Sequence, residues 1–256
     1  MQTALSVNSL GIGHLAAQSQ GMTTPKLLSH LRNGILTLSL NRPDKLNAID
    51  HELALALHEA LQAAARDESV RVVVLEGKGR AFCAGRDVSA PPTEDDLVRV
   101  QAVAQAMVEL PQPVVAAVHG WTLGAGLEWM LNADVVLAAS SARFRLPEAS
   151  LGVFVTGGLT ATLTASAGLA RAKALMLLGQ EFSPVQAQAW GLIWGVTAPE
   201  GLREEAQSIA QQLANLQPEV ARRFKRVLND IGLAQFSKAI ERENEAQRAI
   251  EASKVG

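Results

Sequence analysis

The sequence has one cysteine, no long apolar run and almost no net charge, and each of these absences excludes a class of protein. Cys83 alone cannot form an internal disulfide, which fits a reducing compartment. No apolar run reaches the roughly 18 residues of a membrane-spanning helix. The 23 Lys and Arg residues face 25 Asp and Glu residues, and a net charge of -2 provides no electrostatic reason to bind nucleic acid. We therefore expect a cytoplasmic protein with neither a membrane nor a nucleic-acid partner.

The overall composition is that of an ordinary folded chain. Of the 256 residues, 48% are hydrophobic and 19% are charged, which is typical of globular proteins. Residues 1–21 contain no charged side chain, and we expect them to form a flexible N-terminal extension. We expect a folded core over residues 22–200 and a C-terminal helical region over residues 201–256.

Strand and helix signals alternate along the first two thirds of the chain. Asn33-Gly34 favours a tight hairpin turn between strands at residues 27–31 and 34–40. Asp50 is placed to cap the helix that follows, and Thr93 with Asp96 can begin another helix as a capping box. Further strand signals lie at residues 70–75, 114–118, 134–138, 143–145 and 192–196. This rhythm predicts an α/β fold with parallel strands joined by crossover helices, followed by helices without a sheet of their own.

The segment from residue 114 to 131 holds the strongest candidate site. Gly124 and Gly126 flank Ala125 where a loop should enter a helix, and the free N–H groups at a helix N-terminus can hold an oxyanion. Glu128 follows within the first helical turn, surrounded by apolar neighbours that predict burial. A buried carboxylate requires a partner or a task. Taken alone, Glu128 is explained more simply as a complement to the helix dipole.

A second acidic residue changes this interpretation. Glu148 follows Pro147 in another mainly apolar stretch, and two carboxylates in one buried site can act as general acid and base. The simpler alternative for Glu148 is an ion pair with Arg143 or Arg145. The glycine-containing loop over residues 79–88 indicates by itself only a tight turn.

Together these segments resemble the crotonase superfamily, the enoyl-CoA hydratase and isomerase family. The resemblance runs from about Leu27 to Glu251, through residues 41–48, 81–87, 116–120, 124–128, 147–148 and 151–152. It implies a crotonase-like fold, a spiral of ββα turns followed by a C-terminal helical oligomerisation region. It also implies homotrimers or dimers of trimers that act on acyl-CoA thioesters, with coenzyme A as part of the substrate and no separate cofactor.

The resemblance also implies roles for individual residues. The backbone N–H groups of Arg86 and Ala125 are expected to hold the thioester oxygen, and Glu128 and Glu148 are expected to be catalytic. The positions that we assign to CoA and substrate binding are Lys45, Ala84, Asp87, Gly124, Trp121 and Thr156. These assignments predict an enoyl-CoA hydratase, because a polarised thioester makes the β-carbon electrophilic and stabilises the enolate. The helix terminus is expected to keep Glu128 ionised as the base on water, with Glu148 as the proton donor.

Several alternatives stay open at this point. Thr156 occupies the position of a glycine whose N–H helps to hold water in hydratases, so double-bond isomerisation or another acyl-CoA enolate reaction is the second hypothesis. The chain has no tyrosine, which disfavours family branches that use one for retro-aldol or ring-forming steps. The five histidines form no His-Glu-x-x-His pair, so no metal site is predicted.

A basic run at residues 222–226 keeps an RNA-binding relative among the hypotheses. A solvated helix face, or a contact to CoA phosphate, explains this run more simply. A non-catalytic relative is the remaining alternative, against which the pair Glu128 and Glu148 argues.

Overall fold

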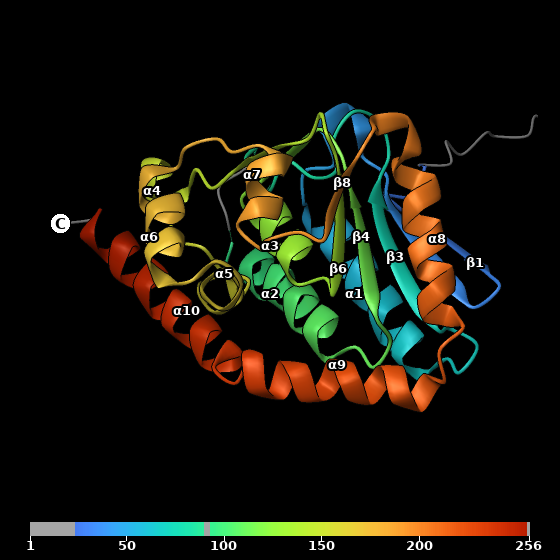
Figure 1. Ribbon diagram of the computed structural model, residues 1–256. Coiled ribbons are helices and arrows are strands. Elements are labelled where there is room, and N and C mark those ends of the chain that lie inside the picture. Colours follow the sequence, from blue (N-terminus) through green and yellow to red (C-terminus); the bar gives the residue numbers. More distant parts are fainter. Residues whose placement is uncertain (1–23, 90–92, 255–256) are drawn as a thin grey trace, which may run out of the picture.

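A six-stranded sheet lies at the centre of the computed structural model, which describes residues 24–89 and 93–254 of the chain (Figure 1). The strand order is β1-β2-β3-β4-β6-β8; only the β1-β2 pair is antiparallel, and the other pairs are parallel. The strands are β1 (Leu27–Arg32), β2 (Ile35–Leu40), β3 (Val72–Gly77), β4 (Val114–Val118), β6 (Val135–Ala139) and β8 (Gly195–Thr197). The predicted α/β fold with parallel crossover connections is confirmed.

The N-terminal hairpin forms where the sequence places it. Asn33 and Gly34 both adopt positive φ, at 51° and 78°, as a tight hairpin turn requires. The pairing runs from Leu27 opposite Leu40 to Arg32 opposite Ile35. A second, small sheet pairs β5 (Trp121–Leu123) with β7 (Arg143–Arg145) in parallel and carries the chain into the candidate site.

Helices cover both faces of the large sheet. On one face, the core contains buried side chains of α1 (His51–Arg66), α2 (Glu94–Glu109) and α3 (Ala125–Leu131). On the other face, α8 (Leu202–Ala214) packs against alternate residues of β3, β4 and β6. The central strands β3, β4 and β6 therefore have buried apolar side chains on both sides, as expected for a sheet between two helical layers.

Side-chain caps fix where the first long helices begin. Asp50 accepts a hydrogen bond from the N–H of Leu53 (2.9 Å) at the start of α1. Thr93 and Asp96 form a reciprocal capping box at the start of α2. Both predicted caps are confirmed, because cap chemistry depends only on residues within one turn.

The remaining helices follow the small sheet. They are α4 (Glu148–Leu151), α5 (Leu159–Ala167), α6 (Leu169–Leu178), α7 (Pro184–Ala189), α9 (Pro218–Gly232) and α10 (Phe236–Ser253). Two short 3-10 turns complete the chain, η1 (Pro43–Lys45) before α1 and η2 (Pro199–Gly201) before α8. Figure 1 shows α9 and α10 running as an arc along one edge of the molecule, with α10 packed beside α5.

The sequence suggested that the basic run on α9 is a solvated helix face, but one of its side chains is buried. Lys225 is buried, pairs with Asp134 (Nζ to Oδ2, 2.7 Å) and donates to the carbonyl oxygen of Met107 (2.9 Å). Arg223 pairs instead with Glu219 on its own helix (2.7 Å). Lys225 was wrongly placed at the surface because its partner lies 91 residues earlier in the chain, at the start of β6.

The structure does not test two of the expectations about how the chain is divided. The extension over residues 1–21 falls outside the described residues, and the boundary at residue 200 stays a prediction. Among the residues that the structure describes, no helix is both long enough and apolar enough to cross a membrane.

Candidate active site

A cavity of about 500 Å³ opens between the loop over residues 84–88, the start of α3, the segment from Pro147 to Thr156, and helices α2 and α10. Its walls are partly apolar and carry both acidic residues singled out in the sequence. The lining residues discussed below are Ala84, Gly85, Arg86, Gly124, Ala125, Glu128, Glu148, Phe154, Thr156, Gln247 and Arg248. Most segments of the predicted site therefore meet in one place.

Two backbone N–H groups are available at this cavity. The amides beside Arg86 are used in the fold, because Ala84 donates to Leu46 O (3.0 Å) and Asp87 donates to Ile49 O (2.8 Å). Within residues 24–89 and 93–254, no acceptor takes the N–H of Arg86 or of Ala125. Ala125 is the first residue of α3, where N–H groups have no intrahelical partner. Both groups can therefore donate to a ligand oxygen.

The loops that carry these two N–H groups are tied closely together. Leu123 donates to Cys83 O (3.0 Å), and a Cβ atom on Gly85 would lie 2.8 Å from the carbonyl oxygen of Leu123 and 3.7 Å from the nitrogen of Ala125. Gly85 has φ of +85°, so a side chain there would be strained as well as obstructed. Close approach of this kind is what a two-donor oxyanion site requires.

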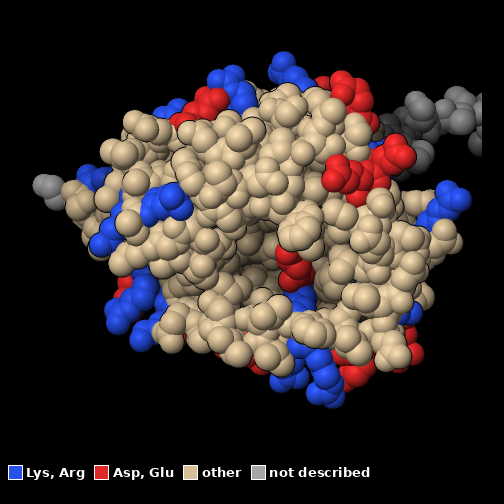
Figure 2. All heavy atoms as spheres, in the orientation of Figure 1, with Lys and Arg blue, Asp and Glu red and all other residues tan. Residues whose placement is uncertain are grey.

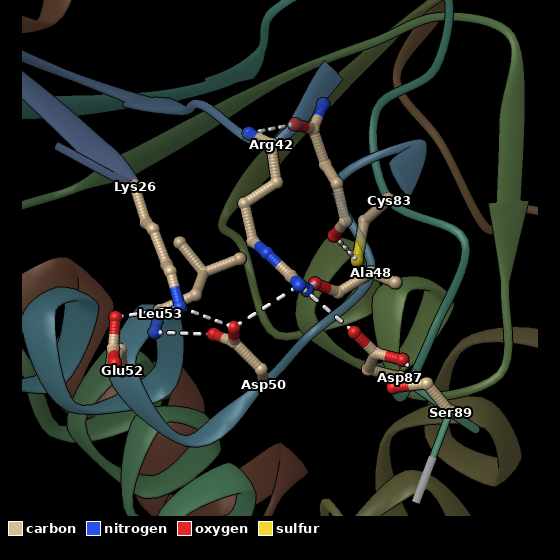
Figure 3. A network of polar contacts seen from close by, with 10 residues as sticks. Lys26, Arg42, Ala48, Asp50, Glu52, Leu53, Cys83, Asp87 and Ser89 are labelled. Atoms are coloured by element: carbon tan, nitrogen blue, oxygen red, sulfur yellow. Dashed lines mark hydrogen bonds and ion pairs between the residues drawn. The ribbon is translucent and has the colours of Figure 1, made fainter. Parts of the chain in front are cut away.

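Arg42 binds the loop at Asp87, the residue directly after Arg86 (Figure 3). Its guanidinium donates to Ala48 O and to Asp87 Oδ2 (2.9 Å), and it also pairs with Asp50 (3.2 Å). The three charged side chains are partly buried, so their ion pairs are less screened than fully exposed pairs. The network fixes the loop through side chains that do not line the cavity.

Glu128 lies on α3 and is 1% exposed. Its Oε1 accepts a hydrogen bond from the N–H of Thr156 (3.1 Å), and its Oε2 lies 3.4 Å from the Thr156 hydroxyl, which donates to it. A Cβ atom on Gly157 would lie 2.5 Å from Glu128 Oε2, so only glycine leaves room for the carboxylate at that point. Apolar neighbours on α3 and the loop after α4 together enclose this side chain.

Glu148 approaches the same cavity from the first residue of α4. A Cβ atom on Gly124 would lie 2.6 Å from its Oε1, which places the carboxyl group beside the start of α3. Its Oε2 is buried and has no hydrogen-bond partner in the described part of the chain. The alternative ion pairs are not formed, since Arg143 pairs with Glu181 (2.8 Å) and Arg145 donates to Gly179 O (2.8 Å). A buried carboxyl oxygen without a partner is typical of a functional group.

The ionisation of the pair differs from what the sequence suggested. Burial raises the pKa of Glu128 to about 8, helped by repulsion from Glu148 and Glu243, and burial raises the pKa of Glu148 to about 7. The expectation that the helix terminus keeps Glu128 ionised was wrong, because removal from water outweighs the helix dipole at a fully enclosed carboxylate. Near neutral pH the two groups hold a proton between them, and their apparent pKa values belong to the pair.

Some residues assigned to CoA and substrate binding lie at the cavity and others do not. Ala84, Gly124 and Thr156 line it. Asp87 is instead engaged by Arg42 and by the N–H of Ser89 (3.0 Å), and this pairing lowers its pKa to about 2. Trp121 stacks under Arg143, with the guanidinium carbon 4.2 Å from the ring centroid, and Lys45 lies in η1. None of these last three lines the cavity.

Cys83 is a packing residue and not a nucleophile. It is 0% exposed, its thiol donates to Asn47 O (3.2 Å), and burial raises its pKa to about 12. Because the thiolate is the reactive form, such a group is inert near neutral pH. No group of three or more His, Cys, Asp or Glu side chains suited to a metal is present among the residues described.

Helix α10 contributes residues that the sequence did not point to. Gln247 and Arg248 line the cavity, and Gln247 Oε1 accepts from the N–H of Phe154 (2.7 Å). The signal was present, since Phe236, Ile240, Glu243 and Gln247 recur at helical spacing and so share one face. Because Glu243 and Gln247 share a helix face with the apolar Phe236 and Ile240, the pattern indicates that these two polar side chains make buried contacts.

The site thus has two free N–H donors, the buried carboxyl group of Glu128 and the partly buried Glu148 around one cavity. Residues 30–254 match the family described as enoyl-CoA hydratase/isomerase. The chain belongs to the enoyl-CoA hydratase/isomerase family. The match covers the sheet, the cavity and α10, so the resemblance to the crotonase superfamily is confirmed over the described fold.

Individual members of the enoyl-CoA hydratase/isomerase family resemble the chain along most of its length. It is 39% identical over 198 residues to a 1,2-epoxyphenylacetyl-CoA isomerase of Escherichia coli (strain K12), covering 73% of this chain and 76% of that protein. It is 35% identical over 224 residues to a 2,3-dehydroadipyl-CoA hydratase of the same organism, covering 82% and 87%. The crystal structure of an enoyl-CoA hydratase from Mycobacterium avium subsp. paratuberculosis K-10 superposes with a TM-score of 0.83 at 29% identity, covering 88% and 89%. The predicted crotonase-like fold is thereby confirmed.

Proposed function

We propose that the protein is an enoyl-CoA hydratase that adds water across the 2,3 double bond of an enoyl-CoA thioester. The observation that carries the proposal is the meeting of Glu128 and Glu148 with the free N–H groups of Arg86 and Ala125 at one cavity. The two N–H groups would hold the thioester oxygen and stabilise the enolate that forms when water attacks the β-carbon. The two carboxyl groups would then move the protons, and the reaction needs no cofactor beyond the CoA of the substrate.

Which of the two glutamates holds the shared proton decides whether the site is ready for hydration or for the reverse reaction. Hydration begins with the proton on Glu148, which donates to the α-carbon while ionised Glu128 accepts a proton from water. The higher pKa of Glu128, about 8 against about 7, favours the opposite arrangement before substrate binds. That arrangement is the starting state for the reverse reaction, in which Glu148 removes the α-proton and Glu128 protonates the departing hydroxyl group. A single proton in the pair therefore serves both directions.

Double-bond isomerisation is the second candidate, and Thr156 is the observation that favours it. The Thr156 N–H and hydroxyl both point at Glu128, so the donor expected to hold a water molecule is used by the carboxyl group itself. In an isomerase, Glu148 would remove the α-proton and protonated Glu128 would return a proton at the γ-carbon. This reaction needs no water in the cavity.

Absorbance of the conjugated enoyl thioester separates the two reactions. With crotonyl-CoA, hydration removes the conjugated double bond and the absorbance falls. With a 3-enoyl-CoA, isomerisation creates the conjugated double bond and the absorbance rises. We expect the fall with crotonyl-CoA. A rise with the 3-enoyl-CoA and no change with crotonyl-CoA would replace the proposal by isomerisation, and a Thr156→Gly variant that then gains hydration would identify the threonine as the cause.

A homotrimer or a dimer of trimers is part of the same proposal. Apolar side chains are exposed on several helices that follow the cavity segments, and Figure 2 shows a hollowed face on which uncharged residues predominate around a hollow that holds acidic and basic side chains. The exposed apolar residues include Leu169, Leu177, Val185, Trp194, Phe224, Val227, Leu228 and Ile231. Large apolar side chains exposed in this number support a protein interface, and a second copy of this chain is the partner that we propose. A cytoplasmic location stays a prediction.

A further inference from the structure

A third buried carboxylate lies close to the catalytic pair, on α10. Glu243 is 1% exposed, as deeply enclosed as Glu128. It accepts three hydrogen bonds, from the N–H of Gly158 (2.8 Å), the N–H of Thr160 (2.8 Å) and the hydroxyl of Thr160 (2.7 Å). The two N–H groups belong to the N-cap residue and the first turn of α5, a helix whose N-cap is a glycine without a capping side chain. Glu243 therefore caps α5 from a distant part of the chain.

The loop between α4 and α5 is held by α10 on one side and by α3 on the other. On the α10 side, Glu243 binds Gly158, and Gln247, one helical turn later, accepts from the N–H of Phe154. On the α3 side, Thr156 donates to Glu128, and the Gly157 carbonyl oxygen accepts from the Asn132 side chain (3.1 Å). Along this short loop, bonds to α10 at residues 154 and 158 flank bonds to the α3 side at residues 156 and 157. Movement of the loop would therefore be transmitted to the Glu128 carboxyl group.

Glycine at residue 158 allows the loop to lie close against α10. Gly158 has φ of +74°, and a Cβ atom there would lie 2.3 Å from the ring of Phe236, at the first turn of α10. The loop thus lies directly against α10 over the length from Phe236 to Gln247. A buried carboxylate at such a contact is costly unless its hydrogen bonds are satisfied, and those of Glu243 are.

We propose that Glu243 is a positioning residue for the general base and acid Glu128. By accepting three hydrogen bonds at the start of α5, it fixes the loop whose Thr156 N–H orients the Glu128 carboxyl group toward the cavity. The inference rests on the proposed acid and base chemistry for its kinetic effect, but the restraint on the loop is independent of any reaction. Repulsion from Glu243 also contributes to the raised pKa of Glu128, and both carboxyl groups bind N–H groups of the same loop.

The test compares Glu243→Ala with Glu245→Ala on the same helix. Glu245 is exposed, and its one ion pair among the described residues is with Arg242 on its own helix (2.7 Å), so this control removes the same kind of side chain without touching the loop. In the Glu243→Ala protein we expect amide hydrogen exchange in the peptide covering residues 153–160 to be at least ~10-fold faster, because local opening becomes easier. We expect kcat to fall at least ~10-fold while KM changes less than ~3-fold, since orientation of a catalytic group acts on the chemical step.

Two outcomes would overturn the proposal. Loop exchange equal to that of the wild type in Glu243→Ala would show that Glu243 does not restrain the loop, whatever reaction the protein catalyses. Faster exchange accompanied by a raised KM and an unchanged kcat would assign the loop to substrate binding alone. If Glu243→Ala does not fold, Thr160→Val removes the hydroxyl bond to Glu243 and is expected to change exchange and kcat in the same direction by a smaller factor. Unchanged exchange and kcat in Thr160→Val would then overturn the proposal.

Discussion

Replacing Glu148 with glutamine is expected to lower kcat for hydration of crotonyl-CoA by at least ~100-fold, the usual contribution of a positioned proton donor. Glutamine keeps the size of the side chain beside Gly124 but cannot release a proton to the α-carbon. KM is expected to change less, because the thioester oxygen is held by backbone N–H groups and not by this side chain. The measurement is the initial rate of absorbance loss over a range of crotonyl-CoA concentrations.

The control for this prediction is Glu181→Gln. Glu181 is a surface carboxylate that pairs with Arg143 and does not line the cavity, so its loss changes the net charge equally but leaves the site intact. A Glu148→Gln protein as active as the Glu181→Gln protein would remove Glu148 from the mechanism. The oxyanion site would then have to account for the rate without this acid.

Replacing Glu128 with glutamine is expected to stabilise the protein at alkaline pH. The folded-state pKa of Glu128 is raised from 4.5 to about 8 by burial, so between these two values the folded chain binds more protons than the unfolded chain. The free energy of unfolding of the wild type therefore falls as pH rises through this window, and the loss is complete above about pH 8. Each pKa unit corresponds to about 1.4 kcal/mol, so the difference between variant and wild type should grow by roughly 2–5 kcal/mol.

Thermal unfolding at pH 5 and at pH 9 checks this prediction. At pH 5 the protonated glutamate resembles glutamine and the two proteins should unfold at similar temperatures. At pH 9 the variant is expected to unfold roughly 5–15 °C higher, on the usual scaling for a chain of this size. Equal differences at both pH values would mean that Glu128 is not forced to ionise in a buried site. Glu128→Gln should at the same time lower kcat, so stability and activity change in opposite directions.

The parts of the fold that were predicted from the sequence depend on short stretches of chain. The Asn33-Gly34 turn, the Asp50 cap and the capping box at Thr93 each need only residues within one turn. Burial of Glu128 followed from the apolar residues that surround it on its own helix. In each case the contact that decides the structure joins residues that are adjacent or nearly adjacent in the sequence.

The parts that were missed depend on residues far apart in the chain. Lys225 is buried beside Asp134, and Asp87 pairs with Arg42 and does not line the cavity. The protonation of Glu128 was misjudged because helix dipole and burial act in opposite directions, and the extent of burial depends on α10, Thr156 and Glu148. Glu243 was overlooked although its helical spacing from Phe236 and Ile240 indicates a buried face, because that spacing does not show which backbone N–H groups far away in the chain it meets.

The central claim is that this cavity stabilises a thioester enolate and that Glu128 and Glu148 move its protons. The most direct measurement is the incorporation of deuterium at the α-carbon of the acyl group when the protein acts on crotonyl-CoA in D₂O, followed by mass spectrometry or NMR of the acyl-CoA product. One deuterium at the α-carbon of the product, incorporated at least ~100-fold more slowly in Glu148→Gln, is the expected result. Incorporation at the wild-type rate in both Glu128→Gln and Glu148→Gln would contradict the account, because the α-proton would then be moved by another group.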